Sequence, residues 1–143
     1  MRSFRRIVLQ TGIAGGLLFV IHSSFPNVYS WPMIWPALAG GAAFWLATRR
    51  PQPHRLRTGL LAALTTGAIT GAIAFVGTSI VIYVAMHTAA GGSVRKAGVS
   101  PGLVTSAGIL ALAVLGVIDV VVAFLAGALM LPFRYFELRR AHS

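Results

Sequence analysis

The sequence predicts an all-α membrane protein, a four-transmembrane-helix antiparallel bundle in a single domain. The chain of 143 residues is 57% hydrophobic and only 10% charged, whereas soluble domains carry about 25% charged residues. Its apolar residues fall into four long runs, and its arginines gather in the short segments beside them. Little charge and long apolar runs are together typical of integral membrane proteins.

The first two predicted spans are short and cover about residues 7–22 and 33–48. Three arginines precede the first span, which we expect to act as an uncleaved signal anchor. Pro26 and Pro32 lie in the uncharged link that follows, and Pro36 falls in the first turn of the second span, where a missing N–H is tolerated. With roughly 16 apolar residues each, these two helices are short for a bilayer core of about 30 Å.

The third and fourth spans cover about 58–86 and 104–131 and are much longer. At about 1.5 Å per residue, each would be about 43 Å long, so we expect these helices to tilt or to project past the membrane. The fourth span ends near Pro132. The tail, 133–143, mixes arginines with aromatic residues, which predicts an interfacial segment lying against an anionic leaflet.

The positions of the basic residues predict the orientation. Ten of the 12 Lys and Arg residues lie before the first span, in the 49–57 loop or in the tail, and only Arg95 and Lys96 lie in the link between the last two spans. Because Lys and Arg accumulate in short cytoplasmic loops, we expect cytoplasmic N- and C-termini in a plasma or inner membrane. The net charge of +10 therefore indicates an anionic cytoplasmic leaflet as a partner, and no nucleic acid.

Small residues predict how the spans pack. Lipid tails are as apolar as leucine, so helices in a bilayer associate where small residues let their backbones approach closely. These positions either hold a monomeric bundle together or, on a GxxxG face such as that of the first span, bind a second copy or another membrane protein. The glycines assigned to helix packing are Gly12, Gly16, Gly67, Gly71, Gly108, Gly116 and Gly127.

Asp119 is the only acid inside a predicted span. It lies among the small residues of the fourth span, about 18 Å from the cytoplasmic edge. An ionised acid at such a depth costs about 2.5–3.5 kcal/mol even on lenient scales, so Asp119 must face protein or water, be protonated or have a partner. An equal depth along the third span reaches Thr70, and we expect a hydrogen bond to Asp119 from the hydroxyl of Thr70 or Thr66.

Three interpretations of Asp119 compete. In the first, it is a hydrogen-bonded clasp between helices, worth about 1 kcal/mol. In the second, it binds a proton or cation during transport, because intramembrane acids are often functional. In the third, it pairs with a basic residue of a partner protein.

His22 and His87 end the first and third spans, where both are expected near the outer face. Two imidazoles on facing helices can ligate haem, or copper together with Met33 or Met86. A single histidine at the end of a span is more often an interfacial polar group. The sequence therefore predicts no cofactor and no metal site. His22 and His87 are the residues that would ligate a cofactor if one were bound.

Few residues in the chain are suited to catalysis. It has two acids, Asp119 and Glu137, and no cysteine, which excludes thiolate sites and makes paired-carboxylate catalysis implausible. The sequence favours a small non-catalytic accessory, assembly or scaffold subunit that packs through Gly/Ala/Thr faces against itself or a larger membrane complex. The alternative is a small proton- or cation-coupled transporter or channel that uses Asp119.

Overall fold

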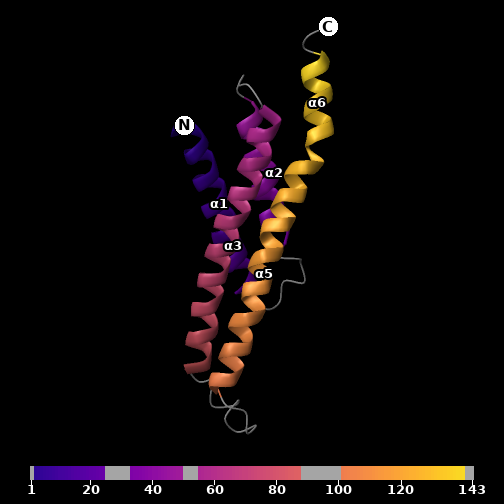
Figure 1. The fold of residues 1–143 in the computed structure, drawn as a ribbon. Helices are drawn as coiled ribbons and strands as arrows, with labels where there is room; N and C mark the ends of the chain where they lie inside the picture. The colour runs from indigo at the N-terminus through magenta and orange to yellow at the C-terminus, as the bar shows by residue number, and fades with distance from the viewer. Residues whose placement is uncertain (1, 25–32, 50–54, 88–100, 141–143) are drawn as a thin grey trace.

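The computed structural model describes residues 2–24, 33–49, 55–87 and 101–140. These ranges are almost entirely helical (Figure 1). The described helices are α1 (Arg2–Ser23), α2 (Ile34–Thr48), α3 (Arg55–His87), α5 (Pro101–Leu129) and α6 (Leu131–Arg140).

Within the described ranges, three apolar helical stretches are long enough to cross a membrane. They lie in α1, in α3 and in the stretch Ser106–Glu137, which runs from α5 into α6. This length and composition indicate an integral membrane protein. α2 is also apolar but has only 15 residues, or about 22 Å of helix.

The helix ends follow from the local sequence. Ala37 donates its N–H to the carbonyl of Met33, and Pro36 occupies the first turn of α2, where its missing N–H does little harm. Between α5 and α6 the helical pattern is interrupted at Met130, whose N–H bonds to Gly127. Pro132 cannot donate an N–H and so favours this break.

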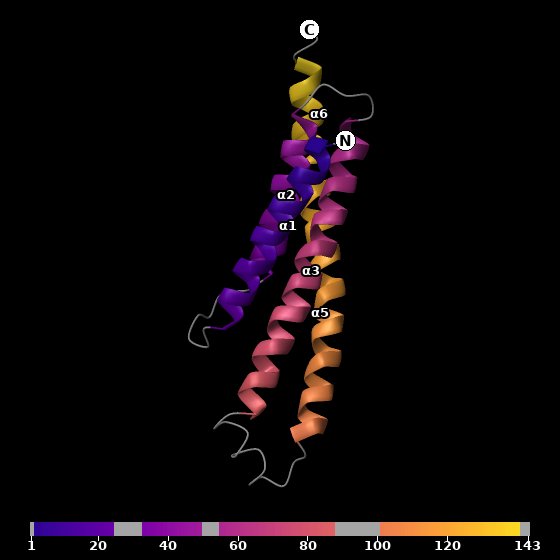
Figure 2. The same ribbon diagram turned by 90° about the vertical axis from the view of Figure 1, so that its left-hand side faces the viewer.

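Figures 1 and 2 show two helical hairpins of unequal length. α3 and α5 lie side by side along the whole molecule, and α1 and α2 lie together against one side of them. Both ends of the chain point towards the same end of the bundle, and α6 continues the direction of α5 (Figure 1). The interfacial position that the sequence predicts for this tail stays a prediction.

The shorter hairpin covers only part of the longer one. Gly77 is the last glycine of α3 that packs on α1, where an added Cβ would lie 2.6 Å from Val20. α1 ends at Ser23, about one turn past Val20, and α3 and α5 continue past the end of the shorter hairpin (Figure 2). We call residues 78–87 and 101–110 the uncovered end, and the rest of the bundle the covered half. Ile80, Tyr83 and Leu110 of the uncovered end are each more than half exposed.

Candidate functional site

Asp119 lies inside the covered half. Its exposed fraction is 0%. One helical turn away on α5, Ala123 is the point at which three helices meet. A Cβ on Gly40 of α2 would lie 2.2 Å from the carbonyl oxygen of Ala123, and a Cβ on Gly67 of α3 would lie 2.8 Å from its Cβ. The face of α5 that carries Asp119 is therefore enclosed by α2 and α3.

Both carboxyl oxygens of Asp119 lack a hydrogen-bond partner among the described residues. The contacts one turn away are made by Gly40, Gly67 and Ala123, none of which has a polar side chain. An unpaired carboxylate is costly in a dry interior because protein dipoles do not replace the lost water. Asp119 is thus the one described acid that is both enclosed and unpaired.

The expected hydrogen bond between a threonine and Asp119 is absent. Thr70 instead donates its hydroxyl to the carbonyl of Gly12 at 3.2 Å, and the hydroxyl of Thr66 lies 3.2 Å from that of Thr11. Both threonines are fully buried. They therefore join α3 to α1, and they leave Asp119 on α5 without a donor.

The geometry of α3 explains why Thr66 and Thr70 do not bond to Asp119. Successive residues of a helix are about 100° apart. Thr66 and Thr70 face α1, and the residue that follows each of them faces α5. A Cβ on Gly71 would lie 2.7 Å from the carbonyl oxygen of Gly116. The predicted depth of Asp119 is consistent with this pairing, but the predicted direction of the hydroxyl groups was wrong.

The glycines of the first span are used inside the chain. A Cβ on Gly12 would lie 2.8 Å from Ile69, and a Cβ on Gly16 would lie 2.6 Å from Ile73. The GxxxG face that was considered for a second copy is therefore occupied by α3. Among the other assigned glycines, Gly67, Gly71 and Gly116 lie between α3 and α5, Gly127 packs on Ala63, and a Cβ on Gly108 would lie 3.5 Å from Ile82.

His22 is bound to α2. Trp35 donates its indole N–H to Nδ1 of His22 at 3.2 Å, and the two rings meet edge to face. A neutral imidazole that accepts at Nδ1 carries its proton on Nε2, so neither nitrogen offers a lone pair to a metal. His87 ends α3, and its side chain lies outside the described residues. The described part of the chain contains no cluster of three metal-ligating side chains.

Arg134 forms a buried polar contact that the sequence did not reveal. It is only 8% exposed, donates to the carbonyl of Thr48 at 3.1 Å and pairs with Glu137. Its guanidinium also lies 5.1 Å from the centre of the Trp45 ring. Arg134 therefore caps the end of α2 from α6. Nothing in the sequence identifies Thr48 as a partner of Arg134, 86 residues away.

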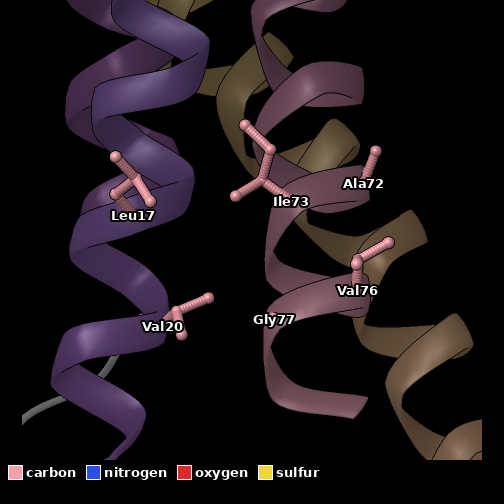
Figure 3. A pocket seen from close by; sticks show the side chains of 6 residues that line it. All are labelled: Leu17, Val20, Ala72, Ile73, Val76 and Gly77. Atoms are coloured by element: carbon pink, nitrogen blue, oxygen red, sulfur yellow. The ribbon is translucent and has the colours of Figure 1, made fainter. Parts of the chain in front are cut away.

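Three grooves lie on the outside of the described helices. One, of about 400 Å³, separates α1 from α3 (Figure 3). Figure 3 shows Leu17 and Val20 on the α1 side of this groove and Ile73 on the α3 side. The others, of about 270 and 280 Å³, lie between α1 and α2 and between α3 and α5. Their linings are almost wholly apolar, and Asp119 lines none of the three.

Comparisons of the chain with protein-family models, curated proteins and solved structures find no match. The function is therefore inferred from the residues and their arrangement. The arrangement provides an enclosed acid and threonine contacts between α1 and α3. It also provides the contact of Arg134 with Thr48 and Trp45 at the end of α2, which we call the arginine clamp.

Proposed function

We propose that this protein crosses a plasma or inner membrane four times, with both termini in the cytoplasm, and serves as a non-catalytic accessory, assembly or scaffold subunit. The main support is the closed packing around Asp119. Glycine contacts bring α2, α3 and α5 together next to this acid, and its side chain is fully buried. Such a site stabilises or specifies a structure, because a transported ion needs a path to either face.

The positions of the arginines support four crossings. Arg6, Arg49 and Arg57 lie near the helix ends at the end of the bundle to which both termini point (Figure 1). Gly77 lies 20 residues along α3 from Arg57, or about 30 Å, and it packs on Val20 near the end of α1. The covered half is therefore about as thick as a bilayer core. On this arrangement α2, though short, crosses together with α1.

The uncovered end supports contact with a larger assembly. Residues 78–87 extend α3 about 15 Å past Gly77, and Ile80, Tyr83 and Val84 are each more than half exposed there. A tilt of about 20°, the average for membrane helices, shortens the span of α3 only slightly. The glycine faces are used within the chain, so a partner would pack on this apolar end.

Native gel electrophoresis tests the subunit proposal. The full-length protein, tagged at its C-terminus and expressed at its normal level, is extracted from its own membrane in a mild detergent. We expect a particle much larger than a monomer or dimer of this 15.1 kDa chain. Monomer alone across several mild detergents would argue against a subunit role.

Proteoliposomes test the transport alternative, which is suggested by the unpaired carboxyl of Asp119. We expect the purified protein and its Asp119→Asn variant to pass protons and monovalent cations no faster than empty liposomes. A flux that the wild type shows and Asp119→Asn lacks would replace the scaffold proposal with transport.

A further inference from the structure

We propose that His22 and Trp35 form a pH-sensitive latch between α1 and α2. The latch lies at the last turn of α1 and the first turn of α2, next to the link between these helices. The indole N–H of Trp35 and Nδ1 of His22 are 3.2 Å apart. The ring centres are 6.3 Å apart, with the planes at 68°. The contact thus fixes the end of the shorter hairpin.

The chemistry of the two rings makes this contact dependent on protonation. An indole N–H can only donate a hydrogen bond, whereas a neutral imidazole accepts at one nitrogen and donates at the other. When a proton from water binds Nδ1, a new N–H bond forms and the acceptor lone pair is lost. Two N–H groups then face each other, and the hydrogen bond between His22 and Trp35 cannot persist.

The protonated state has its own stabilisation. His22 is the basic residue in the last turn of α1. A cation is favoured at the C-terminal end of a helix, where the last carbonyl groups carry partial negative charge. Ser23 and Ser24 beside it are exposed, and the proposed crossings place this end of α1 at the membrane surface, where water reaches the imidazolium. The neutral ring is stabilised by Trp35 and the charged ring by the end of α1, which makes the contact two-state.

The described charged groups lie away from this contact. On α1 and α2 the arginines lie at the helix ends farthest from His22 and Trp35. On α3 they lie in the first turn, also far from this contact. Tyr83 is exposed in the uncovered end, and Asp119 is enclosed by α2 and α3. The described arginines away from the latch are Arg5, Arg6, Arg49, Arg55, Arg57 and Arg134. Histidine side chains in general change charge between about pH 5 and 8, which sets the range to be tested.

Release of the latch affects a groove. Trp35 lines the groove of about 270 Å³ between α1 and α2, together with Leu18 and Leu38. With the indole no longer held by His22, this groove opens towards the end of the hairpin. The inference is independent of the subunit proposal, because it concerns only the two helices of one chain.

Spin-label distances test the latch directly. The chain has no cysteine, so Ser23→Cys and Ile34→Cys introduce the only two labelling sites, both at exposed positions. In the purified full-length protein in nanodiscs, we expect one narrow distance distribution at about pH 8 and a broader, longer one at about pH 5. An unchanged distribution across this range would overturn the proposal.

Two variants separate the latch from general effects of acid. His22→Gln keeps an acceptor oxygen for the indole but does not titrate, so its distribution should stay narrow at both pH values. Trp35→Phe keeps an aromatic ring but removes the donor, so its distribution should be broad at both. A pH response in His22→Gln, or a narrow distribution in Trp35→Phe at about pH 8, would contradict the proposed hydrogen bond as the latch.

Discussion

The covered half and the uncovered end contain the same two helices in different surroundings. In the covered half, α3 and α5 meet α1 and α2 through glycines, and an added Cβ at Gly40 would lie 2.2 Å from a backbone oxygen. In the uncovered end, a Cβ added at Gly108 would have the side chain of Ile82 as its nearest neighbour at 3.5 Å, an ordinary van der Waals contact. The large side chains differ in the same way, since Phe44 is fully buried and Ile80 is 58% exposed.

This difference indicates which part of the molecule holds the helices in their arrangement. Helices in a bilayer gain stability from close packing and not from burying apolar side chains. The covered half therefore contributes most of the stability of the isolated chain. The uncovered end contributes little to it and is available for contacts outside the chain.

The largest expected contrast is between Phe44→Ala and Ile80→Ala. Phe44 contacts the face of α3 at Gly59, and its removal leaves a cavity that costs about 3 kcal/mol. Ile80 has few neighbours to lose, so its truncation should change stability by less than about 0.5 kcal/mol. Unfolding in mixed detergent micelles, followed by circular dichroism, measures both. Equal losses would remove the distinction between the two regions.

A smaller contrast is expected between two adjacent glycines. Gly40→Ala forces a methyl group against the backbone of Ala123 and should cost about 2 kcal/mol. In Gly41→Ala the new Cβ has Met130 as its nearest neighbour at 3.9 Å, so this variant should be as stable as the wild type or slightly more stable. The same micelle unfolding measures the pair, and a stable Gly40→Ala would contradict the close contact between α2 and α5.

The arginine clamp should have an effect of about 1–2 kcal/mol. Arg134→Gln removes the charged donor to the carbonyl of Thr48 and the contact with Trp45. Arg49→Gln is the matched control, because Arg49 is exposed and lies 6.0 Å from the same ring. In thermal unfolding in detergent, the melting temperature of Arg134→Gln should be lower than that of Arg49→Gln. The reverse order would show that the buried arginine does not hold α2.

The smallest expected effect is the coupling between Thr70 and Asp119. Thr70 donates to Gly12, and Asp119 has no partner within the described part of the chain, so the two share no hydrogen bond. The free energies of unfolding of Thr70→Val and Asp119→Asn should therefore add in the double variant within about 0.5 kcal/mol. A coupling near 1 kcal/mol would restore the hydrogen bond that the sequence had suggested.

The positions of the helices could be predicted from the sequence because apolar runs end at prolines and arginines. The fourth span ends near Pro132, for example, and α5 and α6 are separated at Met130. The inward position of Asp119 followed from the small residues around it. The partners of each face could not be predicted, because a rotation of about 100° separates Thr70 from Gly71. The contact of His22 with Trp35 and that of Arg134 with Thr48 depend on how the helices meet, which no local pattern specifies.

The central claim is that the covered half spans the membrane, with the link between α1 and α2 on the outer side. Labelling of single cysteines in right-side-out vesicles with a membrane-impermeant maleimide tests this most directly. Ser24→Cys, at the exposed end of α1, should react in sealed vesicles, and Arg49→Cys should react only after the vesicles are opened. If Ser24→Cys and Arg49→Cys both reacted only after the vesicles were opened, both ends of α2 would lie on the inner side. That result would contradict the four crossings.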